Sequence, residues 1–411
     1  MVSRRDGNKR SNSQWSLGIL ALCAACGVLS LFTMTVALRG AKSPTVTVVQ
    51  SISPRQAAVL PTVAMLDFTD WIRNKVLFVE FIWIDPIDAH THIAKIDPPF
   101  REMLERLHLH VLNILYVDDH QPSRTSLAAQ RQDAFNVADA SAGRVLLCTS
   151  FDPFRISDAG SSQAAITWLN QDFARGAIAV KVWKNVGMEI RNGSGRYVMP
   201  DDSSFEPVYR DIASQHKTLV IHAADPDAAW ASQYATGAST KYYAEHPEWD
   251  MSNKQGAPSK AEILSARNHL LELNPDLEVV GAHFGSMDAQ LNELSRCLDR
   301  YPNFAVDTAA RLPHISLEPR LEVRDFFIKY QDRIVYGTDF SYDAEPEHTN
   351  MANSKAWEDG YLAEWRYLAT DDTFKFRGHQ VQGLDLPRSV LKKIYHDNAV
   401  RWIPGIDSSS H

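Results

Sequence analysis

The segment PIDAHTHI, residues 86–93, decides which fold the sequence predicts, because a short apolar run ends there in His90 and His92. Side chains two apart on a β-strand point to the same face, so both imidazoles would face the same space. The same spacing also occurs at His108 and His110, in RLHLHVLN. Spacing alone therefore does not identify a metal site, and the position of each pair in the fold must decide.

Seven more short apolar runs follow along the chain, and a helix-like amphipathic segment follows most of them. In order they are HVLNILYV (110–117), RVLLCTS (144–150), AIAVKVW (177–183), TLVIHA (218–223), EVVGAHF (278–284), FAVDTA (304–309) and RIVYGTDF (333–340). Near-continuous apolar strands that alternate with helices are typical of a parallel sheet buried on both faces. Eight such strands favour a (β/α)8 TIM barrel over an open, doubly wound sheet.

Composition divides the chain into three parts. Residues 1–40 form a predicted signal or anchor segment, residues 41–75 are a proline-containing stretch without a clear period that we interpret as a linker, and residues 76–405 form the predicted barrel. The formal net charge is −8 and no long Lys/Arg cluster occurs, which argues against nucleic-acid binding. Only Cys148 and Cys297 lie in the barrel region, so a disulfide framework is not expected.

The N-terminal segment predicts an attachment to a membrane. Arg4, Arg5, Lys9 and Arg10 precede the uncharged stretch 15–38. At about 1.5 Å per residue, a helix of that length can cross a hydrocarbon core of about 30 Å. The basic residues before it place the N-terminus inside, so the barrel would be extracytoplasmic, either periplasmic or extracellular. Secretion after signal-peptide cleavage is the alternative, and a buried helix of the fold is a third interpretation.

Barrel enzymes carry their chemistry at the carboxyl ends of the strands. The first, fifth, sixth and eighth runs end there in residues that can bind a metal: His90, His92, His222, His283 and Asp339. His108 and His110 instead come at the start of the second run, the opposite end, and are interpreted as structural or surface residues. A single histidine at a strand end is usually structural, but five such residues at one rim predict a metal centre.

These five positions, with the YGTD motif and the ending YHDNAVRWI, resemble the amidohydrolase superfamily and its family 2 branch over about residues 84–403. The resemblance implies a barrel with a catalytic divalent metal. It implies that His90, His92, His222 and Asp339 bind the metal, that Asp339 also accepts a proton from the attacking water, and that His283 orients that water or protonates the leaving group. The branch includes hydrolases, lactonases and non-oxidative decarboxylases, so no single substrate follows.

Imidazoles and a carboxylate without thiolate suit Zn²⁺ first, and also Mn²⁺, Fe²⁺ or Ni²⁺. We expect one Zn²⁺ per chain. Some superfamily members hold two metals bridged by a carbamylated lysine on the fourth strand, and Lys181 lies in the corresponding run. The alternative is an ion pair of Lys181 inside the barrel, with Asp307 as candidate partner and Lys184 as an exposed neighbour.

Loops at the same rim predict the substrate pocket. Arg311 and His314 follow the seventh run and are candidates for holding a substrate carboxylate, or for simple surface contact. Aromatic residues after the fifth and eighth runs predict apolar pocket walls or the interface of a homo-oligomer: Tyr242, Tyr243, Trp249, Trp357, Tyr361, Trp365 and Tyr367.

The sequence thus predicts a metal-dependent hydrolase that cleaves an ester, lactone or amide bond of a small organic substrate. A metal-dependent decarboxylase with the same ligands is the alternative, and extracytoplasmic placement favours hydrolysis. A barrel that only binds its ligand is a third hypothesis, against which the presence of all five rim residues argues.

Overall fold

The computed structural model describes residues 73, 75–117, 127–231, 238–287, 290–344 and 347–407. The predicted anchor or signal segment, and nearly all of the predicted linker, lie outside the described residues. Within the described ranges, no helix combines the length and the apolar character needed to cross a membrane.

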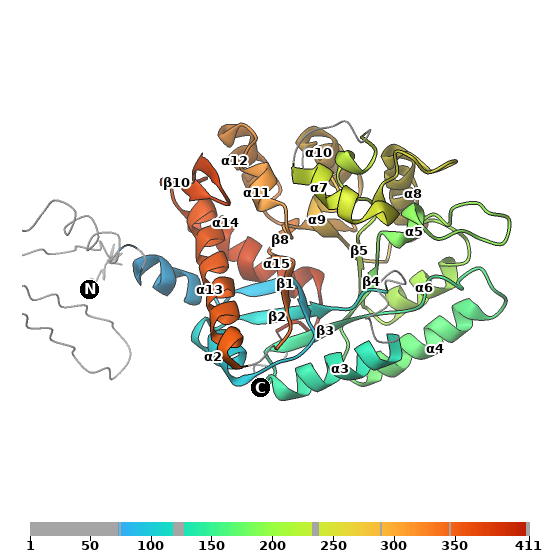
Figure 1. Cartoon of the computed structure of the whole chain (residues 1–411), viewed down its shortest axis with the longest axis horizontal. Helices are drawn as coiled ribbons and strands as arrows, with labels where there is room; N and C mark the ends of the chain where they lie inside the picture. Colours follow the sequence, from blue (N-terminus) through green and yellow to red (C-terminus); the bar gives the residue numbers. More distant parts are fainter. Residues whose placement is uncertain are drawn as a thin grey trace, which may run out of the picture. The chain divides into compact units, whose positions relative to one another are not determined.

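Nine parallel strands form one curled sheet of the TIM-barrel type, in the order β8-β7-β6-β5-β4-β3-β2-β1-β9. The strands are β1 (Ile87–Ile93), β2 (His110–Ile114), β3 (Val145–Ser150), β4 (Ala179–Val182), β5 (Thr218–Ile221), β6 (Val279–Gly281), β7 (Phe304–Asp307), β8 (Ile334–Val335) and β9 (Phe340–Tyr342). Each of the eight predicted runs contains a strand, and the eighth contains β8 and ends at the first residue of β9. Figure 1 shows the strands inside and the helices outside them.

The prediction of one continuous eighth strand is wrong. β8 pairs with β7, and β9 pairs with β1. Between them the chain bonds directly to β1, because Ala89 N donates to Tyr336 O at 2.9 Å and Asp339 N donates to His90 O at 2.8 Å. Asp339 has a φ of 67°, a left-handed conformation that interrupts the strand. The two ends of the sheet are thus joined through this segment, which places Asp339 beside His90.

The buried carboxylate of Asp88 fastens this break to β1. Its Oδ1 accepts from the backbone N–H groups of His90 and Thr338, each at 3.0 Å. Its Oδ2 accepts from the hydroxyls of Thr338 at 2.6 Å and Tyr361 at 2.8 Å. Backbone groups left unpaired in the interior would be costly, so one side chain satisfies the donors that the interrupted ladder leaves open.

Helices cover the outside of the sheet and connect its strands. The longer ones are α2 (Pro98–Arg106), α3 (Leu127–Ala140), α4 (Ser161–Ala174), α6 (Glu206–Ser214), α7 (Ala238–Glu245), α8 (Lys260–Leu273), α10 (Leu291–Arg300), α12 (Arg320–Lys329) and α13 (Glu347–Ala369). The shorter ones are α5 (Asn185–Met188), η2 (Asp227–Ala229), η3 (Pro247–Trp249), α9 (Ala282–Gly285), α11 (Leu312–Ile315), α14 (Arg388–Lys392), η4 (Lys393–Asp397) and α15 (Asn398–Trp402). A hairpin, β10 (Thr373–Phe376) and β11 (His379–Gln382), follows α13.

Local sequence explains where several helices begin. The Asp97 side chain accepts from Phe100 N at 3.0 Å and caps α2, whose first residue is a proline. Ser259 and Glu262 form a reciprocal capping box at the start of α8. The last helical segment of the described residues consists of α14, the π-helical turn η4 and α15.

The interior beneath the rim is apolar. Ala179, Val220 and Ala305 precede Lys181, His222 and Asp307 by two positions, so each pair shares one face of its strand. Ala179, Val220 and Ala305 belong to a buried hydrophobic cluster. The cluster also includes Ile87, Leu112, Cys148, Val280, Val335, Trp402 and Ile403. The last helix therefore packs against the same core, and Lys181, His222 and Asp307 lie above it at the carboxyl ends of the strands.

Candidate active site

A cavity of about 360 Å³ lies at the carboxyl ends of the strands. Its lining includes all five residues that the sequence placed at the rim, together with Lys181 and Arg311. The remaining lining residues are Tyr116, Trp183, Lys184, Asp225, Pro226, Tyr242, Tyr243 and Ser341. The structure therefore brings together, in one small space, side chains that are up to about 250 positions apart in sequence, such as His90 and Asp339.

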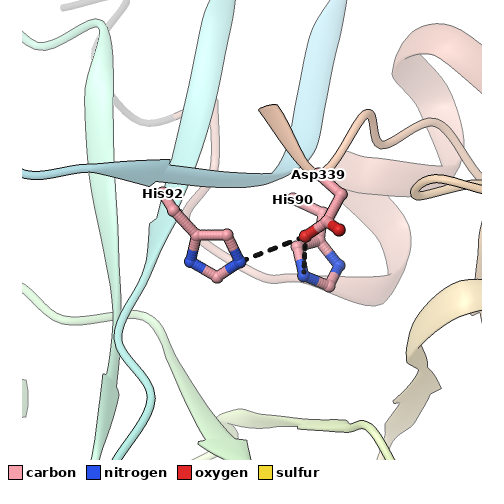
Figure 2. Close-up of side chains that lie close together, drawn as sticks. All are labelled: His90, His92 and Asp339. Carbon is pink, nitrogen blue, oxygen red and sulfur yellow. Dashed lines mark hydrogen bonds and ion pairs between the residues drawn. The ribbon is translucent and has the colours of Figure 1, made fainter. Parts of the chain in front are cut away.

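The tightest group in the cavity consists of His90, His92 and Asp339, whose ligand atoms lie within 4.8 Å of one another. His92 Nε2 is 3.2 Å from Asp339 Oδ1, and His90 Nε2 is 3.5 Å from the same oxygen. Figure 2 shows both rings turned toward the carboxylate. Two imidazole nitrogens and one carboxylate oxygen that meet in this way form a suitable set of metal ligands.

Hydrogen bonds fix which nitrogen of each ring faces the group. His92 Nδ1–H donates to Ile114 O at 2.8 Å, and His90 Nδ1–H donates to Asp307 Oδ2 at 2.7 Å. With the proton on Nδ1, each ring donates one of these bonds and turns its Nε2 lone pair toward the group. Burial also lowers the pKa of His90 well below its usual range, which keeps this ring neutral. Both rings therefore present the atom that a metal needs.

His283 lies in a left-handed turn that the predicted sixth strand did not anticipate. Residues 283–286 all have φ between 55° and 64°, at about 1–2 kcal/mol for each residue other than glycine. His283 N donates to Asp307 Oδ1 at 2.7 Å, and Arg267 Nη1 donates to Gly285 O at 3.1 Å, which holds the turn. Such strain is concentrated at functional sites, and here it aims a side chain into the cavity.

The His283 ring is also held as a neutral tautomer. Its Nδ1–H donates to Ala309 O at 2.9 Å, which leaves the Nε2 lone pair for the cavity. Burial lowers its pKa well below the usual range, and the nearby charges of His222 and Arg311 lower it further. The ring lies 4.9 Å from that of His90, centroid to centroid. His283 is therefore suited to accept a hydrogen bond from a polar group in the cavity.

His222 lies beside the group of three rather than within it. Its ring is 4.3 Å from that of His283, and its Nε2 is 3.4 Å from Asp225 Oδ1. Burial lowers the pKa of His222 to about 4, an effect that Asp225 partly offsets. The predicted fourth ligand is thus in the cavity, but it is the most distant of the four from the common point.

The donor set fits a divalent cation. His90 Nε2 and His222 Nε2 are buried and have no hydrogen-bond partner among the described residues. Buried polar atoms are rarely left unpaired, so such atoms at a cavity wall indicate that a ligand binds there. Neutral imidazoles and an ionised carboxylate are the ligands that zinc and related metals prefer in catalytic sites.

The prediction that Asp307 forms an ion pair with Lys181 is wrong. Asp307 Oδ2 accepts from His90, and Asp307 Oδ1 accepts from His283 N and from Ala309 N, the last at 3.1 Å. Lys181 Nζ is buried and finds no hydrogen-bond acceptor within the part of the chain that the structure describes. Burial lowers the pKa of Lys181, with Asp307 acting in the opposite direction. Asp307 therefore serves the histidines instead.

Lys184 was expected to be an exposed neighbour, and this was also wrong. Lys184 is 4% exposed, and its Nζ donates to Asp225 Oδ2 at 2.7 Å. It also lies 4.3 Å from the ring centre of Trp249 and 3.3 Å from Tyr242 OH. Asp225 was missed in the sequence, although it comes three positions after His222, where the loop enters the rim.

The other candidate residues divide between the cavity and the rest of the protein. Arg311 lines the cavity, whereas His314 is exposed on α11 and does not line it. Tyr242 and Tyr243 line the cavity, but the aromatic residues of α13 are buried in the core. His108 and His110, at the start of β2, are not among the lining residues.

A parallel barrel sheet whose strands end in converging imidazoles and a carboxylate places this chain among TIM-barrel proteins with a candidate metal centre. The family profile described as Amidohydrolase (Amidohydro_2) matches residues 87–404. The chain belongs to this amidohydrolase family, whose members bind a divalent metal. The resemblance found in the sequence is confirmed.

Several solved structures are similar to this chain. An uncharacterized TIM-barrel protein from Bordetella bronchiseptica is 14% identical, with a TM-score of 0.47, and the match covers 78% of this chain and 99% of that one. 2,6-Dihydroxybenzoate decarboxylase from Rhizobium is 14% identical, with a TM-score of 0.41, and the match covers 77% of this chain and 98% of that one. A putative amidohydrolase from Staphylococcus aureus is 12% identical, with a TM-score of 0.44, and the match covers 77% of this chain and 99% of that one. No match was found among curated proteins.

Proposed function

We propose that this chain is a metal-dependent hydrolase that cleaves an ester, lactone or amide bond of a small organic substrate. The observation that carries the proposal is the convergence of His90, His92 and Asp339 at one point of the cavity, next to a neutral His283. The family and the donor set support a divalent metal there, and zinc is our first choice.

His90, His92, Asp339 and His222 would hold one metal ion. Bound there, the ion would polarise the scissile carbonyl and lower the pKa of a water molecule toward about 7. The Asp225 carboxylate lies next to His222 and is itself held by Lys184, so this pair fixes the position of the fourth ligand. Loss of an interaction that orients a metal ligand typically lowers metal affinity or activity about 10–100-fold.

Asp339 would accept the proton of the attacking water and pass it to the leaving group. Burial alone would raise its pKa, but the neighbouring imidazoles of His283, His92 and His90 lower it well below its usual range. The carboxylate is therefore ionised at neutral pH and able to take a proton.

His283 would orient the attacking water by accepting a hydrogen bond at Nε2. Its lowered pKa favours this role over donation of a proton from an imidazolium ion, the other role that the sequence left open. The left-handed turn and the Asp307 carboxylate hold the ring in place while it acts.

A decarboxylase is the second candidate, since cationic side chains in the cavity suit a substrate with a carboxylate. An experiment in water labelled with heavy oxygen distinguishes the two reactions. The protein is incubated in it with aryl esters, lactones and hydroxy-aromatic acids, and the products are analysed. Heavy oxygen in a product carboxylate supports hydrolysis. Release of CO₂, with solvent deuterium on the product carbon and no heavy oxygen in a new carboxylate, would contradict hydrolysis and support the lyase.

We also propose that the N-terminal segment anchors the barrel at the extracytoplasmic face of a membrane. The proposal rests on the basic residues before the apolar stretch 15–38. The full-length protein should fractionate with membranes. A mature N-terminus near Leu38 would show a cleaved signal peptide and a secreted protein instead.

A further inference from the structure

We propose that the helix of residues 75–82 holds the barrel against the surface of a phospholipid bilayer, with one apolar face of the helix in the headgroup region. This helix precedes β1 and is drawn in blue in Figure 1. The inference rests on the proposed membrane attachment of the N-terminal segment, and it adds a second contact that the barrel itself makes. It comes from a surface that the cavity and its chemistry do not use.

The sequence of this segment is apolar on both sides of the helix. Residues 76–84 read VLFVEFIWI, and Glu80 is the one charged residue among them. An ordinary surface helix has one apolar face, which packs on the core, and one polar face toward water. A second apolar face therefore indicates contact with a second apolar environment.

The inner face fastens the helix to the barrel. Leu77 is buried, and Phe81 is completely buried. The ring centroid of Phe81 lies 5.8 Å from that of Trp365, on α13, and 5.9 Å from that of Tyr395, on η4. These contacts fix the rotation of the helix, so its other face is directed outward.

The outer face carries Val76, Val79 and Trp83, spaced three and four positions apart, as residues on one side of a helix are. Trp83 N donates to Val79 O at 3.0 Å, so Trp83 continues the last turn. Val76 is 48% exposed, Val79 is 47% exposed and Trp83 is 73% exposed. Three of the seven large hydrophobic side chains that are exposed in the described ranges thus share one short helix. Single exposed apolar residues are ordinary, but a cluster of this kind marks an interaction surface.

The charge of the segment does not oppose burial in an apolar layer. Glu80 forms an ion pair with Arg388 of α14, at the flank of the helix. An unpaired charge would be costly in apolar surroundings, whereas a paired one at the edge of the contact is not. The outer face therefore offers apolar side chains alone, and its contact does not need anionic lipid.

Lipid fits this face better than a protein partner does. Tryptophan is enriched at the boundary between membrane and water. A helix of eight residues is about 12 Å long, too short to cross a hydrocarbon core of about 30 Å, so it would lie in the boundary layer. The chain reaches this helix directly from residues 1–72, which include the apolar stretch 15–38. A stable protein interface buries about 800 Å² on each partner, more than three side chains supply.

The place of the helix in the fold sets which end of the barrel meets the membrane. Residues 83–86 connect the helix to the amino end of β1, whereas the cavity lies at the carboxyl ends of the strands. The cavity therefore opens away from the bilayer, and its substrate arrives from water.

Photo-crosslinking in the full-length protein tests the inference. The photoreactive residue p-benzoylphenylalanine replaces Trp83 in one variant and Leu317 in another, and each protein is reconstituted into vesicles of phosphatidylcholine. Leu317 is the matched control, because it is also an apolar side chain, 56% exposed, but follows β7 and α11 at the carboxyl end of the barrel. Mass spectrometry after irradiation identifies the adducts. We expect at least about tenfold more lipid adduct at position 83 than at position 317, because an interfacial helix lies only about 5–10 Å deep.

Equal yields at the two positions would overturn the inference. A crosslink from position 83 to a second copy of the chain, or to residues 1–72 of the same chain, would identify another partner and overturn it too. Val79→Glu places a charge in the outer face and should remove most of the lipid adduct at position 83, and an undiminished yield would count against the apolar contact. Thermal unfolding checks that each variant is folded.

Flotation of the same vesicles separates this inference from the proposed anchor. Protein that floats with the vesicles but forms no lipid adduct at position 83 contradicts the inference and leaves the anchor in place. Lipid adduct at position 83 in a chain whose mature N-terminus lies near Leu38 contradicts the anchor and supports the inference. Protein that does not float contradicts both.

Discussion

Replacement of Asp307 by asparagine is the change from which the structure predicts the clearest loss of metal. The Asp307 carboxylate accepts from His90 Nδ1–H on one oxygen and from the N–H groups of His283 and Ala309 on the other. An amide has one oxygen and one NH₂ group, so in either orientation the NH₂ group faces an N–H donor. At least one charge-assisted bond is lost, about 1.5–3 kcal/mol, with a donor-to-donor contact in its place.

Because this bond sets the tautomer and the direction of the His90 ring, the affinity for the metal should fall about 10–100-fold. Competition with a chromophoric chelator measures it, and thermal unfolding reports stability. Asp172→Asn is the matched control, since Asp172 is equally buried but accepts from Thr149 and Arg131, away from the cavity. It should lower the unfolding temperature and leave metal affinity unchanged. The reasoning is refuted if Asp307→Asn binds metal like the wild type, or if the control loses as much.

Other changes test the roles of single residues. Asparagine tolerates the left-handed backbone at position 283, so His283→Asn should retain the metal while kcat falls about 10²–10⁴-fold. A loss of metal as large as in His90→Ala would show instead that His283 is a metal ligand. His110→Gln should leave metal content and turnover unchanged, and a loss of either would contradict the strand-end argument. Burial raises the pKa of Glu364 to about 8. In the unfolded chain Glu364 loses its proton near pH 4.3, whereas in the folded protein it keeps the proton up to about pH 8. The free energy of unfolding of the wild type therefore decreases as pH rises from about 4.3 to about 8. Glu364→Gln has no titratable group at this position and does not show this decrease. Urea unfolding should show the variant gaining up to about 5 kcal/mol relative to wild type across that window, and a constant difference would refute the shift.

The residues that converge in the cavity could be found in the sequence because of where they stand in it. His90, His92 and His222 each end an apolar strand, and the barrel rule assigns that end to the active site. The same rule separated His108 and His110 from them, although their spacing is identical. Local pattern and one fold-level rule were sufficient for this part.

The residues that hold the site in place, Asp307 and Asp88, could not be identified from the sequence in the same way. Asp307 lies 217 positions from His90, and a carboxylate on a strand does not show which donors it will meet. The interruption at Asp339 is held by Asp88, 250 positions from its bonding partner Thr338, so strand pattern alone predicted a continuous strand. Such contacts depend on tertiary packing rather than on local propensity.

The metal content of the purified protein tests the central claim most directly. Elemental analysis of the full-length wild type and of His92→Ala, purified side by side, should show about one divalent transition metal per chain in the first and almost none in the second, because the variant removes one of the three converging ligands. A wild type without metal, or a His92→Ala protein that retains the full amount, would contradict the account.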